Sequence, residues 1–369
     1  MCDNIDEFPK LIKKLNLSNE LCKKCQGENG KSVFLLRNDD KPFCKNCFLL
    51  SCIHKFRSEF GKTQVVRQGE KLLVGFSGSP SSIAMLLLIK QGLSEKEFRK
   101  LRFSPIFVHI NENDEIQPEI KEFLSGSGFP FHVISASKLA DVRLSILNEN
   151  LKNPKFSTAN KTTKNILLKS ILCDLAVEFG CSRVMLANNC TTQAMRVLSN
   201  IAQGSASYDD TAFHDTRHSL SILQPMRQFS VKEIIFFNRF HGISSQFSAN
   251  EETFTDKTFS IDRLTEGFIA SLTSDFPSTI FTISRTAEKM TSIATEKEKK
   301  QCQFCGNHYK SHNEMLGEST AANAMAFSQT LMQSITSKKT EIVNGSPSVD
   351  NLCYTCQSIQ EEIDLPLIH

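Results

Sequence analysis

The chain of 369 residues contains no tryptophan and only three tyrosines, and this absence excludes nothing by itself. It also lacks a long apolar run: the longest, Ile83–Ile89, is far shorter than the roughly 20 residues that a membrane-spanning helix needs. The first residues, MCDNIDEFPK, lack the basic and apolar regions of a secretory signal peptide. We therefore expect a cytoplasmic protein with no membrane partner.

The chain has no strong excess of charge of either sign. Its net charge of +3 and isoelectric point near 8.2 permit nucleic-acid binding without arguing strongly for it. A hydrophobic fraction of 40% and a charged fraction of 22% are ordinary for a soluble protein. The length indicates two or three domains.

Thirteen cysteines would be many for a reducing compartment if they formed disulfides, so metal ligation explains them better. Four of them form the N-terminal cysteine quartet: Cys22, Cys25, Cys44 and Cys47. The 18 residues between the two Cys-x-x-Cys pairs are typical of a zinc ribbon or treble clef with one structural zinc ion. Unligated buried cysteines are the alternative, and Cys52 or His54 could replace one ligand. Lysines in this region either face RNA phosphate or are simply solvated.

A second set of paired cysteines lies near the end of the sequence. The C-terminal cysteine quartet consists of Cys302, Cys305, Cys353 and Cys356. Its pairs are 47 residues apart, which is tolerable because the cost of closing a loop grows slowly with length. We predict a second zinc ion here, and the alternative is two unrelated pairs, one of them redox-active. Cys173 and Cys181 are expected to pack in the core.

Alternating strand and helix patterns between residues 65 and 245 predict a parallel α/β domain. The predicted strands are Leu72–Phe76, Pro105–Ile110, Phe131–Ser135, Arg183–Ala187 and Ser219–Leu223. The predicted helices are Ser82–Gln91, Ile116–Leu124, Thr163–Phe179, Gln193–Ile201, one from the capping box Ser230–Glu233 to Phe240, and one near Ile261–Leu272. Sheets of this kind bind ligands beyond the carboxyl ends of their strands.

A serine-rich turn lies at that edge of the predicted sheet. The apolar run Lys71–Phe76 leads into Ser77-Gly78-Ser79-Pro80-Ser81-Ser82, which we call the serine turn. A strand, a tight polar turn and a helix present backbone N–H groups to a phosphate. The serine turn contains no Lys, Asp or Glu that would anchor a metal ion or drive chemistry. It is therefore predicted to be the remnant of a nucleotide loop.

The order of quartet, serine turn, α/β domain and quartet resembles the PP-loop tRNA thiolases with two zinc sites. It resembles more closely the cytoplasmic tRNA 2-thiolation protein 2 family, the divergent partner of the catalytic thiolase subunit. The segment Phe43–Phe48 followed by His54–Arg57 is similar to the N-terminal signature of that family, and Phe76–Ser82 is similar to its phosphate turn. The resemblance implies a PP-loop sheet of the adenine nucleotide alpha hydrolase-like, Rossmann-like type, flanked by two zinc-ribbon-like modules.

The sequence departs from the active PP-loop thiolases at three places. Ser81 stands where their phosphate turn carries an aspartate, and Thr191-Thr192 stand where they carry two carboxylates. No cysteine occurs between Cys52 and Cys173, where active members carry a Cys-x-x-Cys pair for sulfur chemistry. Cys190 is the one cysteine near the carboxyl end of a predicted strand, and loop packing is the alternative to a catalytic role. We therefore predict no catalytic residue.

The resemblance implies a non-catalytic subunit of a heterodimeric cytosolic tRNA thiolase. That complex would thiolate the wobble uridine, position 34, of tRNAs for Lys, Gln and Glu, with sulfur from a ubiquitin-like carrier. This subunit would support tRNA binding and assembly. Two alternatives are that the chain itself adenylates tRNA as an ATP-dependent sulfurtransferase, or that it is a zinc-ribbon scaffold for RNA or protein unrelated to thiolation. The sequence leaves open whether ATP or AMP binds.

Basic residues outside the quartets are candidates for RNA contact. Three of them precede the first predicted strand of the α/β domain: Arg57, Lys62 and Arg67. The fourth, Arg227, lies in a region that resembles a basic segment of the active enzymes. His109 and His132, on predicted strands, are expected to be core or edge residues. A loop before the fifth strand is predicted to contain His214, Asp215, Arg217 and His218.

The composition divides the chain into four expected parts. An N-terminal zinc-binding module is expected over residues 1–60 and the PP-loop-like α/β domain over residues 61–245. A Ser/Thr-rich helical connector follows over residues 246–301. The C-terminal zinc-binding module, with a polar insert, is expected over residues 302–369.

Overall fold

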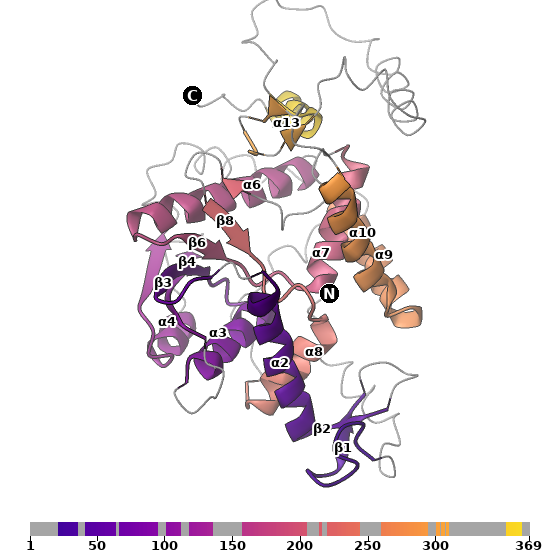
Figure 1. Ribbon diagram of the computed structural model, residues 1–369. Helices are drawn as coiled ribbons and strands as arrows, with labels where there is room; N and C mark the ends of the chain where they lie inside the picture. Colours follow the sequence, from indigo (N-terminus) through magenta and orange to yellow (C-terminus); the bar gives the residue numbers. More distant parts are fainter. Residues whose placement is uncertain are drawn as a thin grey trace, which may run out of the picture.

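The computed structural model describes residues 21–35, 41–63, 66–94, 101–111, 118–135, 157–204, 214–215, 220–243, 260–293, 300–302, 304–306, 308–309 and 352–363. They form a parallel sheet covered by helices, with a small hairpin carrying cysteines near each end of the chain (Figure 1). Cys2, Arg217, His218 and most of the polar insert before Leu352 lie outside the described residues.

The central sheet has the strand order β5-β4-β3-β6-β8-β7. Its strands are β3 (Glu70–Gly75), β4 (Phe103–Asn111), β5 (Phe131–Ser135), β6 (Arg183–Met185), β7 (His214–Asp215) and β8 (Leu220–Leu223). All pairs are parallel except β7 with β8. The five predicted strands are therefore confirmed, with β6 ending two residues earlier than predicted.

The predicted loop around His214 and Asp215 is wrong at these two residues. They form β7, an antiparallel edge strand in which His214 pairs with Ser221 and Asp215 with Leu220. A two-residue strand is too short to show the alternation of apolar and polar residues by which strands are recognised. Its existence depends on the neighbouring β8, which supplies the backbone partners.

The helices of the core agree with the predicted ones. They are α3 (Pro80–Leu93), α4 (Pro118–Ser125), α6 (Ser157–Glu178), α7 (Cys190–Ala202) and α8 (Val231–Phe240). The predicted capping box is present: the Ser230 hydroxyl accepts from the Glu233 N–H, and the Glu233 carboxylate accepts from the Ser230 N–H. None of the described helices is long and apolar enough to span a bilayer.

The two faces of the sheet have different covers. On β3, Leu72 and Val74 belong to a large apolar cluster with α2 (Lys45–Thr63), α3 and α8, whereas Leu73 belongs to a second cluster with α6. Consecutive residues of a strand point to opposite faces, so this central strand is apolar throughout because both of its faces are covered. Cys173 and Cys181 are buried in the α6 cluster, as predicted.

A long helix joins the N-terminal hairpin to the core. The hairpin consists of β1 (Ser32–Phe34) and β2 (Phe43–Cys44), and α2 (Lys45–Thr63) follows directly. The buried side chains of Phe48, Cys52 and Phe56 recur at helical spacing and lie in the same cluster as Leu72 and Val74. The boundary expected between residues 60 and 61 therefore falls inside a continuous helix.

A helical hairpin and a second cysteine-bearing hairpin follow the core. The helices α9 (Ile261–Asp275) and α10 (Thr279–Ile293) both pack on α7. The helix predicted near Ile261–Leu272 is confirmed as α9, whereas α10 was not predicted. Beyond them, β9 (Lys300–Gln301) pairs with β10 (His308–Tyr309), and α13 (Tyr354–Ile363) packs on α6.

Candidate functional site

The serine turn lies where the sheet changes direction. From β3 the chain adds β4 and β5 on one side, then returns to add β6 and β8 on the other side of β3. Ligands of such sheets bind beyond the carboxyl ends of the two strands at this switch point. The serine turn follows β3, and the turn Asn188–Asn189 follows β6. The structure therefore brings together the two turns that sequence reasoning placed at one edge.

The hydroxyl groups of the serine turn bond largely to one another. The Ser77 hydroxyl donates to Ser79 Oγ at 2.9 Å, and the Ser82 hydroxyl donates to the Ser79 carbonyl at 2.8 Å. Ser79 is the N-cap of α3 and accepts from the Ser82 N–H at 3.4 Å. Gly78 has φ of +76°, which a side chain would disfavour. The turn connects a strand to a helix N-terminus, as a phosphate loop does, and its hydroxyl groups form neutral hydrogen bonds within the turn.

Asn189 connects the two turns. Its Nδ2 donates to Ser81 Oγ at 2.9 Å, and its Oδ1 accepts from the Thr192 N–H at 2.9 Å as the N-cap of α7. From α8, Asn238 Nδ2 donates to the Pro80 carbonyl at 2.8 Å. Two helix N-termini therefore start at this edge of the sheet, and their partial positive charge suits an anion. The turns themselves contain no carboxylate to hold Mg²⁺.

Cys190, at the start of α7, has the environment of a packing residue. It is fully buried among Ala194, Ile269 and Ile280. Burial raises the pKa of the Cys190 thiol to about 11, although a contact with the Ser284 hydroxyl acts to lower it. A protonated, enclosed thiol is a poor nucleophile. The alternative of loop packing is the one that fits the structure.

The two predicted strand histidines have structural partners. His109 on β4 is buried, and its Nδ1 lies 2.8 Å from the Phe76 carbonyl. The ring of His132 on β5 stacks on Phe179 with centroids 4.3 Å apart. These contacts agree with the prediction that both are core or edge residues.

The N-terminal cysteine quartet is assembled in space. Each of its four sulfur atoms lies within 4.8 Å of the others, and Cys25 Sγ is 3.7 Å from Cys44 Sγ. Four thiolates about 2.3 Å from a tetrahedral metal ion would be about 3.8 Å apart, so the spacing fits a zinc ion. Backbone N–H groups of Asn29 and Cys47 donate to Cys25 Sγ and Cys44 Sγ, and these contacts orient the two side chains. Cys52 belongs instead to the apolar core.

The C-terminal cysteine quartet is assembled in the same way. Cys302 and Cys305 lie at the β9–β10 hairpin, Cys353 and Cys356 lie at the start of α13, and the four sulfurs are within 4.8 Å of one another. Cys305 Sγ and Cys353 Sγ are 3.8 Å apart, which again fits a tetrahedral metal ion. The long insert between the pairs therefore does not prevent closure of the site.

The residues predicted to contact RNA lie on α2, just before β3 and between β8 and α8. The Arg227 guanidinium is bound to two carboxylates, Glu59 at 2.8 Å and Glu288 at 3.1 Å, so a phosphate would have to compete with both. Arg57 is half-buried on α2, and Lys62 lies in the last turn of that helix. Arg67 is exposed, and its N–H donates to Glu70.

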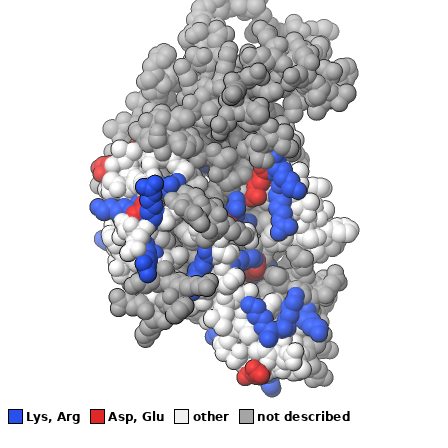
Figure 2. Space-filling view, in the orientation of Figure 1, with Lys and Arg blue, Asp and Glu red and all other residues white. Residues whose placement is uncertain are grey.

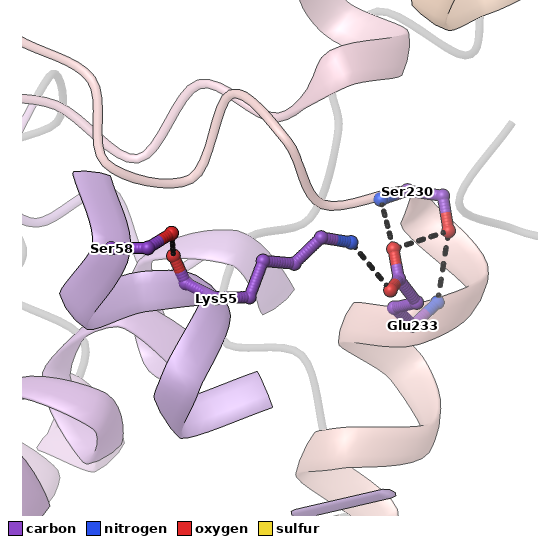
Figure 3. A network of polar contacts seen from close by, with 4 residues as sticks. All are labelled: Lys55, Ser58, Ser230 and Glu233. Atoms are coloured by element: carbon purple, nitrogen blue, oxygen red, sulfur yellow. Dashed lines mark hydrogen bonds and ion pairs between the residues drawn. The ribbon is translucent and has the colours of Figure 1, made fainter. Parts of the chain in front are cut away.

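A network that sequence reasoning missed fixes α2 against α8. Lys55 Nζ donates to Glu233 Oε1 at 2.6 Å, and the other oxygen of this carboxylate caps α8 through Ser230 (Figure 3). The Glu233 side chain is only 7% exposed, so the pair is largely desolvated. The sequence signal for α2 is the helical spacing of Phe48, Cys52 and Phe56. It was overlooked because these residues directly follow the second Cys-x-x-Cys pair, in the segment expected to form the metal module.

Comparisons with known proteins agree with this architecture. Residues 260–358 match the family model described as cytoplasmic tRNA 2-thiolation protein 2. The protein of that name from Danio rerio is 31% identical over 343 residues, which cover 74% of this chain and 68% of the relative. The chain belongs to the cytoplasmic tRNA 2-thiolation protein 2 family. Cytoplasmic tRNA 2-thiolation protein 2-A from Xenopus laevis is 28% identical and extends the match to 98% of this chain and 85% of the relative.

The fold of this family member is also that of a solved tRNA thiolase. The U34-tRNA thiolase NcsA from Methanococcus maripaludis superposes with a TM-score of 0.61 over 78% of this chain and 92% of NcsA. At 17% sequence identity, the likeness shows the fold alone. The prediction of a PP-loop sheet with a cysteine module at each end is confirmed.

Proposed function

We propose that this chain is the non-catalytic subunit of a heterodimeric cytoplasmic tRNA thiolase that 2-thiolates the wobble uridine of tRNAs for Lys, Gln and Glu. The observation that carries the proposal is the set of neutral side chains at the switch point. Ser81, Thr191 and Thr192 stand where active PP-loop thiolases carry carboxylates. Asn189 joins the two segments, because its Nδ2 donates to Ser81 Oγ and its Oδ1 accepts from the Thr192 N–H. The membership of the chain in its family supports tRNA thiolation as the pathway.

Activation of the uridine by adenylation requires ATP and a metal ion held by carboxylates. The serine turn retains backbone donors and a helix N-terminus, which suffice for an anion but not for Mg²⁺. Its hydroxyls are already engaged in hydrogen bonds with one another and with Asn189. This arrangement supports a structural role for the turn, with adenylation assigned to the partner subunit.

Delivery of sulfur requires a reactive thiolate or a cluster held by cysteines. The chain has no cysteine between Cys52 and Cys173. Cys190, the cysteine closest in sequence to the Asn188–Asn189 turn, is buried with a raised pKa. Sulfur transfer is therefore also assigned to the catalytic PP-loop subunit, which would receive sulfur from a ubiquitin-like carrier as a thiocarboxylate.

Two zinc ions are proposed as structural cofactors, one in each quartet. A closed shell of four cysteines leaves no open position for a catalytic water, so the metal would support folding rather than chemistry. We propose that residues 1–60 and 302–369 contain these modules, and that residues 61–245 and 246–301 provide the core and the connecting helices. The chain would act in the cytoplasm, as the names of its relatives state for those proteins.

The proposal is tested by measuring 2-thiouridine in tRNA for Lys after incubation with ATP, a sulfur donor and purified protein. The chain alone is expected to give no product, whereas the chain with its catalytic partner gives thiolated tRNA. Turnover by the chain alone would instead establish it as an adenylating sulfurtransferase. Full activity of the partner without this chain would favour a scaffold unrelated to thiolation.

A further inference from the structure

The two cysteine quartets share their ligands but differ in the residues between those ligands. In the N-terminal quartet the residues enclosed by the pairs are Lys23-Lys24 and Lys45-Asn46. In the C-terminal quartet they are Gln303-Phe304 and Tyr354-Thr355, which carry no charge. Both quartets are fully assembled. Lysine is therefore not required to gather or to stabilise four thiolates in this protein, and its presence in one quartet needs another explanation.

The two quartets also differ in what surrounds them. The C-terminal quartet packs inward: Ile166 of α6 contacts it, and the Thr355 hydroxyl donates to the Gln203 carbonyl at 3.3 Å. The corresponding residues of the N-terminal quartet, Lys23, Lys24 and Lys45, are all exposed. The first quartet thus presents its enclosed lysines to solvent, whereas the second uses Thr355 to attach α13 to the end of α7.

We call Lys23, Lys24 and Lys45 the lysine face. Because the two Cys-x-x-Cys pairs meet at one metal site, the lysines between them are held within a small area. Figure 2 shows Lys and Arg side chains gathered on the N-terminal module, in the region of β1 and β2. Exposed Lys31 and Lys41 belong to the same module, and Glu28 is the one exposed acid in its described residues. Even beside the two negative charges of a zinc tetrathiolate, the described module remains positive.

We propose that the lysine face binds the phosphate backbone of RNA, and the inference rests on the proposed function for its choice of tRNA. Lysine is depleted from protein–protein interfaces, whereas it is a main donor to nucleic-acid phosphates. Ligation would hold the two turns rigid, so little conformational entropy would be lost on binding. The Lys23 N–H donates to the Pro42 carbonyl at 2.8 Å, and this hydrogen bond ties the first Cys-x-x-Cys turn to the residue that precedes β2.

The position of the lysine face relative to the sheet is fixed by α2. Lys45 begins this helix, and its ammonium lies 5.7 Å from the ring centroid of Phe240 at the end of α8. Ten residues further along α2, about three helical turns, Lys55 is bound to Glu233 at the start of α8. RNA bound by the lysine face would therefore be held at a defined distance from the switch point rather than on a freely moving module.

The test compares two triple variants in the complex of the full chain with its catalytic partner. Lys23→Gln/Lys24→Gln/Lys45→Gln removes the lysine face, and Lys71→Gln/Lys90→Gln/Lys121→Gln removes the same charge from exposed lysines of β3, α3 and α4. The probe is unmodified tRNA for Lys, titrated at several salt concentrations. The first variant is expected to bind about tenfold more weakly and to lose about two to three units of log–log salt slope. The second is expected to bind like the wild type.

Zinc content and the triple variant Lys23→Arg/Lys24→Arg/Lys45→Arg serve as folding and charge controls. Unchanged zinc with restored binding in the arginine variant supports a charge contact with phosphate. Equal weakening by both glutamine variants would overturn the assignment to this face. Normal tRNA binding with loss of the catalytic partner would show a protein-docking surface instead. If the wild-type complex does not bind tRNA, the proposed function itself is contradicted. If only the lysine-face variant fails to bind, the proposed function stands and the lysine face is supported.

Discussion

At the scale of single residues, Glu233 combines two structural roles. One oxygen of its carboxylate accepts from the Ser230 N–H at 2.8 Å and from the Ser230 hydroxyl at 3.1 Å, and the other accepts from Lys55 at 2.6 Å. The side chain is therefore both the reciprocal cap of α8 and the anchor of α2 (Figure 3). A single carboxylate therefore holds α2 and α8 in contact, and the two paired residues, Lys55 and Glu233, are 178 positions apart in the sequence.

The substitution Glu233→Gln is expected to lower the free energy of unfolding by about 1–3 kcal/mol, since it leaves the partly buried Lys55 ammonium without its anion. The measurement is the midpoint of urea unfolding of the zinc-loaded chain. Glu178→Gln, at the exposed end of α6, is the matched control and should change stability by less than about 0.5 kcal/mol. Equal midpoints for both variants would contradict the anchoring role.

Glu70, at the start of β3, gives a pH dependence with a defined sign. Burial acts to raise the pKa of this carboxyl, but donation from the Ser182 hydroxyl and the Arg67 N–H, together with the Arg183 charge, outweighs it and lowers the pKa. A lowered pKa contributes stability above the unfolded value of 4.5, and that stability is lost as the pH falls through the folded value.

The variant Glu70→Gln should therefore be less stable than the wild type at pH 7, and the difference should shrink as the pH falls below about 4. Urea unfolding at a series of pH values measures this difference. A difference that stays constant from pH 7 to pH 3 would show that the carboxylate contributes through packing alone.

At the scale of elements, the two cysteine hairpins are attached to the core in different ways. The first continues into α2, whose buried face contributes Phe48 and Phe56 to the main apolar cluster. The second belongs to a quartet that packs on Ile166 of α6, and Thr355 of α13 donates to the Gln203 carbonyl at the end of α7. Loss of the first metal site should therefore affect the core more than loss of the second.

Elemental analysis should find two zinc ions per wild-type chain and one in each of the variants Cys22→Ser and Cys353→Ser. We expect the first variant to lower the thermal midpoint of the whole chain and the second to leave the main transition nearly unchanged. The two serine substitutions are matched controls for each other. A wild-type stoichiometry near zero would contradict metal binding, and equal effects on the midpoint would contradict the role given to α2.

Most core elements could be predicted because each has a local pattern of its own. The five predicted strands are short and largely apolar runs, and the capping box of Ser230 and Glu233 predicts the start of α8. The helix α10 was missed because Thr279, Thr282 and Thr286 favour helices only weakly. It forms against α7 and α9, where Ile280 is buried, and such tertiary support has no local signature.

At the scale of the whole molecule, the candidate site depends on contacts between distant segments. The sequence placed the serine turn and the Asn188–Asn189 turn at the same edge, because both follow parallel strands. The hydrogen bond from Asn189 to Ser81 spans 108 residues and could not be predicted from either segment alone. The ion pairs of Arg227 with Glu59 and Glu288 also join distant segments and could not be predicted. They give a structural role to a residue that was predicted to contact RNA.

The continuity of α2 limits how this protein can be recombined with its relatives. Cys47 contributes its thiol to the N-terminal cysteine quartet from the first turn of the helix, and Phe56 lies in the core nine residues later. If the N-terminal modules of two relatives were exchanged at residue 60, the buried face of α2 from one protein would have to pack on α3 and α8 of the other. The smallest segment that evolution or an engineer can transplant intact therefore runs from the first cysteine pair through α8, because metal module and sheet share one apolar interior.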